Sequence, residues 1–135
     1  MSDQTWLPEP TEAARPFFDG AKEGKLRLQS CNQCHHWSFP PMTVCQNCGS
    51  SDISWKDASG EGTVYAHGRL ARQYHPRHTN RLPIVLAQVD IAEGARLNTN
   101  IVGTDPNHIK AGDKVRVTFE QFDDGGVIPV FELAD

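Results

Sequence analysis

The amino-acid sequence predicts a mainly β protein in which an N-terminal helix and a small metal-binding ribbon precede a five-stranded barrel. Two observations lead to this fold class. Four cysteines stand in two Cys-x-x-Cys pairs, a spacing typical of knuckle-type metal sites. After Gly60, short β-rich stretches alternate with turn residues, which indicates consecutive strands. The 135 residues divide into a helical segment (1–24), a zinc ribbon (25–57) and a barrel domain (58–135).

The first expected element is a helix between Thr11 and Gly24. Thr11 is a candidate N-cap, and glycine is typical of the position just after a helix. Pro16 interrupts this stretch. Either the helix is kinked at Pro16, or a second helix begins there, where the missing N–H is tolerated. The apolar edge consists of Phe17, Phe18 and Ala21. That edge packs either on the protein's own body or on a partner subunit, because so short a helix needs a docking surface.

The ribbon is expected to begin with a strand. Polar and apolar residues alternate over 25–30, which predicts a strand leading into the first cysteine pair. Pro40 and Pro41 impose an extended path toward the second pair. Three aromatic residues are expected to cover the metal and form the small core of the ribbon: Trp37, Phe39 and Trp55.

The cysteines carry the strongest chemical signal in the chain. They are Cys31, Cys34, Cys45 and Cys48. Two such pairs supply the tetrahedral four-sulfur shell of a closed structural zinc site. A rubredoxin-like iron site or a redox dithiol uses the same residues, so the spacing leaves these alternatives open. His35 or His36 could replace a thiolate, although four thiolates already complete the shell. We expect one structural zinc ion, whose binding supplies folding free energy to a ribbon that buries little apolar surface.

The barrel is expected beyond Gly60. Five stretches have the composition or alternation of strands, namely 62–70, 82–91, 95–102, 114–119 and 127–133. One helical turn is expected at 105–110, and 123–126 is a hairpin signal between the last two strands. Five strands with a helical element after the third are typical of the OB-fold, a partly open Greek-key barrel.

Composition limits the classes of partner. The formal net charge is −4, whereas nucleic-acid-binding proteins usually carry a basic surplus. No apolar run approaches the roughly 20 residues of a membrane span, and no secretory signal is visible. We therefore expect a soluble, cytoplasmic protein that does not act at a membrane. A nucleic-acid-binding module is the alternative, because zinc ribbons and OB-folds recur in such proteins.

The order of these parts resembles the DUF35 family. The resemblance covers nearly the whole chain and rests on four features: the N-terminal helix, the cysteine pairs with Phe39-Pro40-Pro41 between them, Gly60-Glu-Gly-Thr-Val64 and Ile128-Pro-Val-Phe131. It implies a zinc ribbon followed by an OB-fold. It also implies a non-catalytic accessory subunit of a thiolase-fold enzyme acting on acyl-CoA, such as a thiolase, a retro-aldolase or an acyltransferase. The implied partner is that thiolase-fold subunit, with acyl-CoA at the shared interface.

His35 departs from the family pattern, in which glycine usually follows the second cysteine of the first pair. Glycine favours the positive-φ turn that lets backbone N–H groups point at sulfur. His35 must therefore accept a strained conformation or use another geometry. All four cysteines are present, so the departure concerns local geometry and not metal binding.

Independent catalysis is not expected from this chain. A thiolase-type reaction needs a nucleophilic cysteine, and metal binding would occupy every thiol. A four-thiolate site also lacks the open coordination position of a catalytic metal, and no Gly-x-Ser-x-Gly motif is present. We expect the chemistry to belong to the partner.

Arginines are concentrated in one stretch without acidic residues. They are Arg69, Arg72, Arg77 and Arg81. CoA carries a 3′-phosphate and a pyrophosphate, which guanidinium groups bind through charge-assisted, bidentate hydrogen bonds. Either these arginines contact CoA, or they solvate a long loop and pair with acidic residues of the partner.

Overall fold

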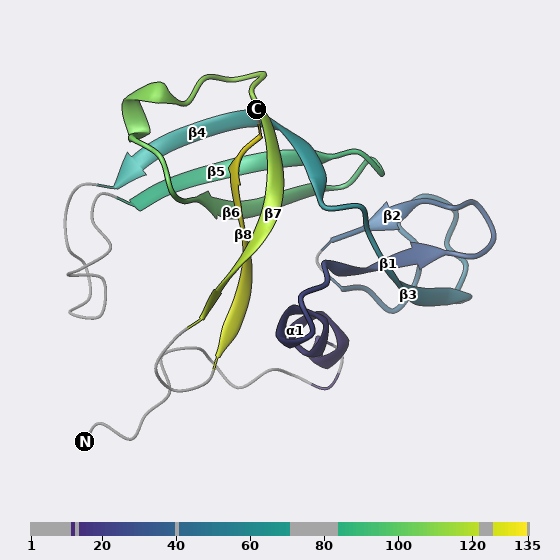
Figure 1. The fold of residues 1–135 in the computed structure, drawn as a ribbon. Coiled ribbons are helices and arrows are strands. Elements are labelled where there is room, and N and C mark those ends of the chain that lie inside the picture. Colours follow the sequence, from purple (N-terminus) through teal and green to yellow (C-terminus); the bar gives the residue numbers. More distant parts are fainter. Residues whose placement is uncertain (1–11, 13, 40, 71–83, 122–125, 135) are drawn as a thin grey trace.

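The computed structural model describes residues 12, 14–39, 41–70, 84–121 and 126–134. These residues form two sheets, one α-helix and a short 3-10 helix (Figure 1). The first sheet is a three-stranded ribbon, and the second closes into a five-stranded barrel. No helix in the described ranges is long and apolar enough to cross a membrane.

The helix α1 spans Arg15–Lys22. Of the two starts that the sequence allows, the structure has the later one, with Pro16 in the first turn. At this position the missing N–H leaves no helical hydrogen bond unmade. Gly24 follows the helix with φ of 78°, the left-handed conformation common just after a helix end. The expected N-cap, Thr11, lies outside the described residues.

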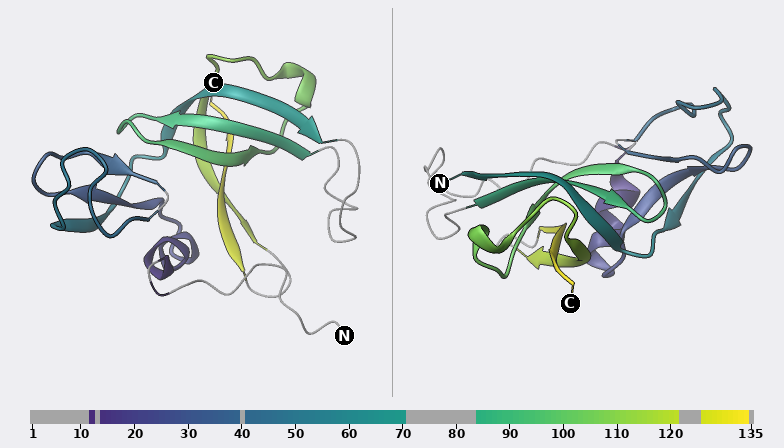
Figure 2. Two further views of the ribbon diagram at one scale, coloured as in Figure 1. Left: turned by 180° about the vertical axis from the view of Figure 1, so that it is seen from behind. Right: turned by 90° about the horizontal axis from the view of Figure 1, so that it is seen from above.

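The apolar side of α1 packs on the protein's own body. The ring centroid of Phe17 lies 5.3 Å from that of Phe39 and 5.1 Å from that of Phe18. Gly20 and Ala21 are buried. The helix contacts both β1 (Arg27–Cys31) of the ribbon and β8 (Val127–Leu133) of the barrel, and therefore lies where the two sheets meet (Figures 1 and 2).

The ribbon sheet has the order β2-β1-β3. The central strand β1 (Arg27–Cys31) pairs antiparallel with β2 (Trp37–Ser38) and with β3 (Ile53–Asp57). A side-chain contact holds the loop before the second cysteine pair, because the Met42 N–H donates to Oε1 of buried Gln29 at 2.7 Å.

The barrel confirms the OB-fold that the sequence predicts. Its strands are β4 (Glu61–Leu70), β5 (Ile84–Ile91), β6 (Arg96–Ile101), β7 (Lys114–Gln121) and β8 (Val127–Leu133). They close in the order β4-β5-β6-β8-β7, with β4 paired to β7. The 3-10 helix η2 (Pro106–His108) lies between β6 and β7, where a helical turn was expected. β7 and β8 pair antiparallel, although most of the expected hairpin, residues 123–125, lies outside the described residues.

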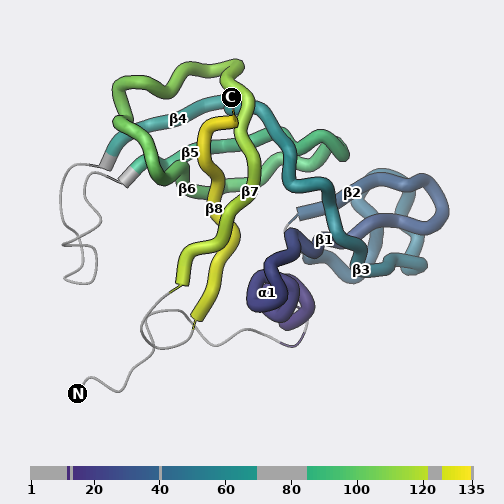
Figure 3. Tube along the Cα trace, in the orientation of Figure 1, coloured from purple at the N-terminus to yellow at the C-terminus, as the bar shows by residue number. Residues whose placement is uncertain are grey.

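One apolar core serves both sheets. Leu26 and Leu28 of the ribbon belong to the same buried cluster as Val64, Val89 and Phe131 of the barrel. Trp37 and Phe39 also pack against this cluster. Two of the three aromatic residues expected to form a separate ribbon core, Trp37 and Phe39, therefore contribute to a shared one. The chain then passes directly from β3 into β4 (Figure 3).

Gly62 lies at the closure of the barrel, opposite Ile91 on β5 and Val115 on β7. A Cβ atom at this position would lie 2.6 Å from Cγ1 of Val89 and 2.9 Å from the carbonyl oxygen of Asp90. The absence of a side chain at Gly62 therefore lets β4 and β5 approach each other closely.

We expect Gly62→Ala to lower the free energy of unfolding by about 1–3 kcal/mol, because overpacking a tight core forces the backbone to shift. Gly68→Ala on the same strand is the matched control, since a Cβ there meets no atom within 4 Å. Urea unfolding followed by circular dichroism measures both variants. Equal unfolding midpoints for the two would show that the barrel closure is not tight at Gly62.

Candidate metal centre

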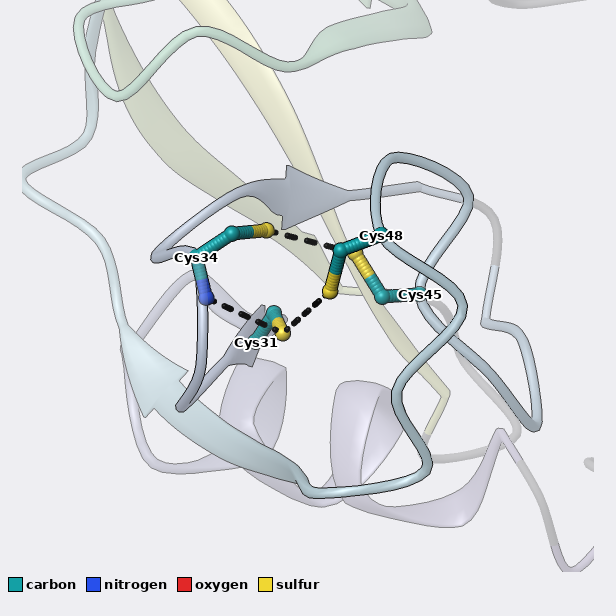
Figure 4. A group of neighbouring side chains, drawn as sticks. All are labelled: Cys31, Cys34, Cys45 and Cys48. Carbon is teal, nitrogen blue, oxygen red and sulfur yellow. Dashed lines mark hydrogen bonds between the residues drawn. The ribbon is translucent and has the colours of Figure 1, made fainter.

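The four thiols converge on one point (Figure 4). Their sulfur atoms all lie within 4.8 Å of one another. The Sγ atoms of Cys31 and Cys48 are 3.6 Å apart, as are those of Cys34 and Cys45. These separations exceed the ~2.05 Å of a disulfide and approach the roughly 3.8 Å expected between sulfurs around a tetrahedral zinc with Zn–S bonds of about 2.3 Å. The donor set therefore fits a closed four-thiolate metal site.

Backbone N–H groups of both loops point at the sulfurs. The Gln33 N–H donates to Sγ of Cys31 at 3.3 Å, and the Asn47 N–H donates to Sγ of Cys45 at 3.3 Å. A metal bound by four thiolates carries excess negative charge, and N–H donors around the sulfurs stabilise it. The two Cys-x-x-Cys loops thus supply electrostatic support as well as ligands.

His35 adopts the strained conformation that its position requires. Its φ is 66°, and it is the one non-glycine residue with positive φ among the described residues. Its N–H donates to the Cys31 carbonyl at 2.9 Å, just as the N–H of Gly49, with φ of 80°, donates to the Cys45 carbonyl at 2.9 Å. The first loop therefore keeps the geometry of the second at the expense of local strain.

No imidazole joins the thiol cluster in the described part of the chain. The one group of metal-ligating side chains found there consists of the four cysteines. Cys31 and Cys45 are buried, whereas Cys48 is exposed. Two of the thiols are therefore anchored in the protein interior, and one side of the cluster faces solvent.

Asn47 is a neighbour of the thiol cluster that the sequence analysis did not identify. Its side-chain amide donates to Sγ of Cys34 at 3.4 Å, so it connects the second Cys-x-x-Cys loop to a sulfur of the first. This bond, together with the N–H of His36, lowers the pKa of Cys34 to about 6. In the sequence, the only indication was that an amide residue stands between the two cysteines of the second pair. Which sulfur this amide contacts depends on how the two loops are placed relative to each other.

The pKa of Cys48 shifts in the opposite direction. The N–H of Ser50 lowers its pKa, but the neighbouring Cys31 thiol, burial of the sulfur and the other two thiols together raise that pKa to about 12. Four adjacent thiols cannot all ionise without a compensating charge. A divalent cation at their centre supplies that charge and favours the thiolate form of every ligand.

The structure places only one of the four candidate arginines. Arg69 is exposed near the end of β4, opposite Val85 of β5. Arg72, Arg77 and Arg81 lie outside the described residues. The CoA contact expected for this stretch remains a prediction.

Two family models match consecutive parts of the chain. The rubredoxin-like zinc ribbon domain of ChsH2 matches residues 18–54. The C-terminal OB-fold domain of ChsH2 matches residues 55–120. The ribbon match and the geometry of the thiols agree on one structural zinc ion.

Three similar proteins extend this comparison. A probable enoyl-CoA hydratase alpha subunit of Thermomonospora curvata is 35% identical over 118 residues, which make up 87% of this chain and 36% of that subunit. A DUF35 domain-containing scaffold protein of Methanothermobacter thermautotrophicus is 27% identical over 117 residues, covering 86% of this chain and 87% of the relative. The solved structure of the Ltp2-ChsH2(DUF35) aldolase contains a chain that matches with a TM-score of 0.85 and 33% identity, over 96% of this chain and 100% of that one. The chain thus spans little more than a third of the length of the hydratase subunit.

We expect Asn47→Ala to weaken zinc binding by about 10-fold, because loss of an outer-shell hydrogen bond typically lowers metal affinity 10- to 100-fold. The matched control is Gln46→Ala, an exposed amide in the same loop. Competition with a chromogenic chelator measures zinc affinity, and the sulfur-to-metal absorption band of the cobalt-substituted protein reports the ligand shell directly. If both variants retain wild-type affinity and the same cobalt spectrum, Asn47 has no role at the metal.

Proposed function

The chain belongs to the DUF35 family of ChsH2-type proteins, and on this premise we propose that it is a non-catalytic accessory subunit of a thiolase-fold enzyme complex that acts on acyl-CoA. The observation that carries the proposal is the similarity, over essentially the full length of both chains, to the chain in the Ltp2-ChsH2(DUF35) aldolase structure. In this role the protein stabilises its partner, and acyl-CoA lies at or near the interface.

The names of the relatives support a role outside the chemical step. One relative is a hydratase alpha subunit, one is a scaffold protein and one is part of an aldolase. Hydration and aldol cleavage make and break different bonds, yet the same ribbon and barrel accompany both. A module common to different reactions is expected to bind and position, while a partner or a further domain determines the reaction.

The metal centre supports the same conclusion. We propose that Cys31, Cys34, Cys45 and Cys48 are the four ligands of the zinc ion. A metal held by four thiolates has no open position for water or substrate, and its ligands are no longer nucleophiles. The zinc then has a structural role: it orders the ribbon and so presents a stable surface to the partner.

Co-purification with candidate partners tests the accessory role. We expect the tagged protein, co-expressed with its neighbouring open reading frames, to retain a thiolase-sized subunit through gel filtration, with acyl-CoA turnover only in the complex. The tag alone, expressed with the same reading frames, is the control. A folded protein that retains no neighbour and binds single-stranded oligonucleotide at low salt would instead support the nucleic-acid-binding alternative.

Charge reversal tests the proposed contact between CoA phosphates and the arginine stretch, comprising Arg69, Arg72, Arg77 and Arg81. We expect Arg77→Glu with Arg81→Glu to raise the KM of the complex for acyl-CoA by about 10-fold or more, because each charge-assisted bond contributes about 1.5–3 kcal/mol. The control carries Lys22→Glu and Lys110→Glu, two exposed lysines elsewhere, and has the same net charge. An identical KM for the two variants would assign the arginines to the loop or to the partner.

A further inference from the structure

A shallow groove crosses the outer face of the barrel over β4, β5 and β6. Its volume is about 530 Å³. Its lining combines apolar residues, amides, one hydroxyl and one imidazole: Ala66, His67, Leu86, Ala87, Gln88, Asn98, Thr99 and Asn100. The lining contains no carboxylate, lysine or arginine, which is unusual for the exposed face of a chain with a net charge of −4.

The alternation of β5 places the side chains of Leu86 and Gln88 on the outside of the barrel. Val85, Ala87 and Val89 are buried in the barrel core, so the residues between them project outward. Leu86 pairs across the strands with Asn100, and Gln88 pairs with Asn98. Leu86 remains 51% exposed, so an apolar side chain stands beside amides on an open face.

The amides retain unused hydrogen-bonding capacity. Gln88 donates to Oδ1 of Asn98 at 3.1 Å, and Asn100 donates to the carbonyl oxygen of Val85 at 3.0 Å. These bonds use one N–H of Gln88 and one of Asn100. The Gln88 and Asn100 carbonyls and the Asn98 NH₂ group are then available to a ligand. Both donors and acceptors face outward, which suits a ligand that offers both.

Space and charge restrict the occupant. Next to the groove, Asp90 holds Arg96 at 2.6 Å, and Arg96 lies 3.5 Å above the ring of Tyr65. The guanidinium of Arg96 is therefore paired with its own neighbours, and the groove lining contains no lysine or arginine for a phosphate. A Cβ on Gly68, opposite Leu86, would meet no atom within 4 Å, so there is room beside Leu86 for an incoming side chain.

We propose that this groove binds an extended, uncharged polypeptide segment of the partner subunit. A peptide backbone offers one N–H and one C=O per residue, which complements the amides of Gln88, Asn98 and Asn100. An apolar side chain of the segment packs against Leu86 and Ala66. The absence of charge matches an uncharged segment, because burying an unpaired charge at an interface is unfavourable. This inference rests on the accessory function proposed above and specifies the surface that performs it.

The test compares one substitution at two asparagines. Asn98→Arg places a long cation in the groove, and we expect the Kd for the purified partner subunit to rise by about 10-fold or more. Asn107→Arg introduces the same change at an exposed position on η2, outside the groove, and is expected to leave Kd unchanged. Equal Kd values for the two variants overturn the proposal while leaving the accessory function intact. If the wild-type protein binds no partner, both proposals fail together.

Hydroxyl-radical footprinting of the wild-type protein is a second test, and its result does not depend on whether the variants fold. Leu86 is exposed and therefore reactive toward hydroxyl radicals, so we expect its modification to fall severalfold in the complex. Protection of Leu86 by the partner supports the proposal even if Asn98→Arg loses its fold. Protection by a single-stranded oligonucleotide or by CoA alone, with none by the partner, overturns it and assigns the groove to that ligand.

Discussion

The convergence of four thiols on one point is the constraint on which the rest of the structure depends. Four adjacent sulfurs can all be thiolates only around a cation, and both loops arrange backbone N–H groups for that state. Satisfying the constraint requires two positive-φ residues, one of them the strained His35. The same convergence involves the end of β1, because Cys31 is both one of the four clustered thiols and the last residue of that strand. Leu28 lies on the same strand and belongs to the buried core, so β1 connects the thiol cluster to that core.

The shared apolar core joins the ribbon and the barrel into one folded unit. A ribbon of this size buries too little apolar surface to be stable alone, but Leu26 and Leu28 lie in the same cluster as Phe131 of the barrel. The helix α1 closes the junction through Phe17, which packs on Phe39 of the ribbon and against the common core. A scaffold needs such rigidity, since a partner held by a flexible junction would lose affinity to ordering entropy. A zinc ion held by four thiolates would have no open coordination position, which is consistent with this mechanical role.

Local patterns in the sequence predicted most of the fold, and the features they missed all depend on contacts between distant segments. Cys-x-x-Cys spacing and strand alternation are properties of short stretches, so the thiol cluster and the five barrel strands were predictable. Pro16 permitted two helix starts, and packing of Phe17 on the core accompanies the later one. Asn47 acquired its role only because one loop meets the other, and the pairing of Gln88 with Asn98 requires the register of β5 against β6. Exposure of Leu86 likewise follows from which face of β5 the barrel encloses.

The groove and Arg69, the one described residue of the arginine stretch, share strand β4, and this proximity bears on the proposed accessory role. Arg69, where the arginine stretch begins, is two residues from His67, which lines the groove, and lies opposite Val85, the neighbour of Leu86. A partner segment in the groove would therefore hold the partner's surface within a few residues of the first arginine. Uncharged contacts would then determine docking, and charged contacts would act on the phosphates of CoA beside it. Such a division would be physically economical, because cations at the rim of an interface stay partly solvated whereas its docking core excludes charge.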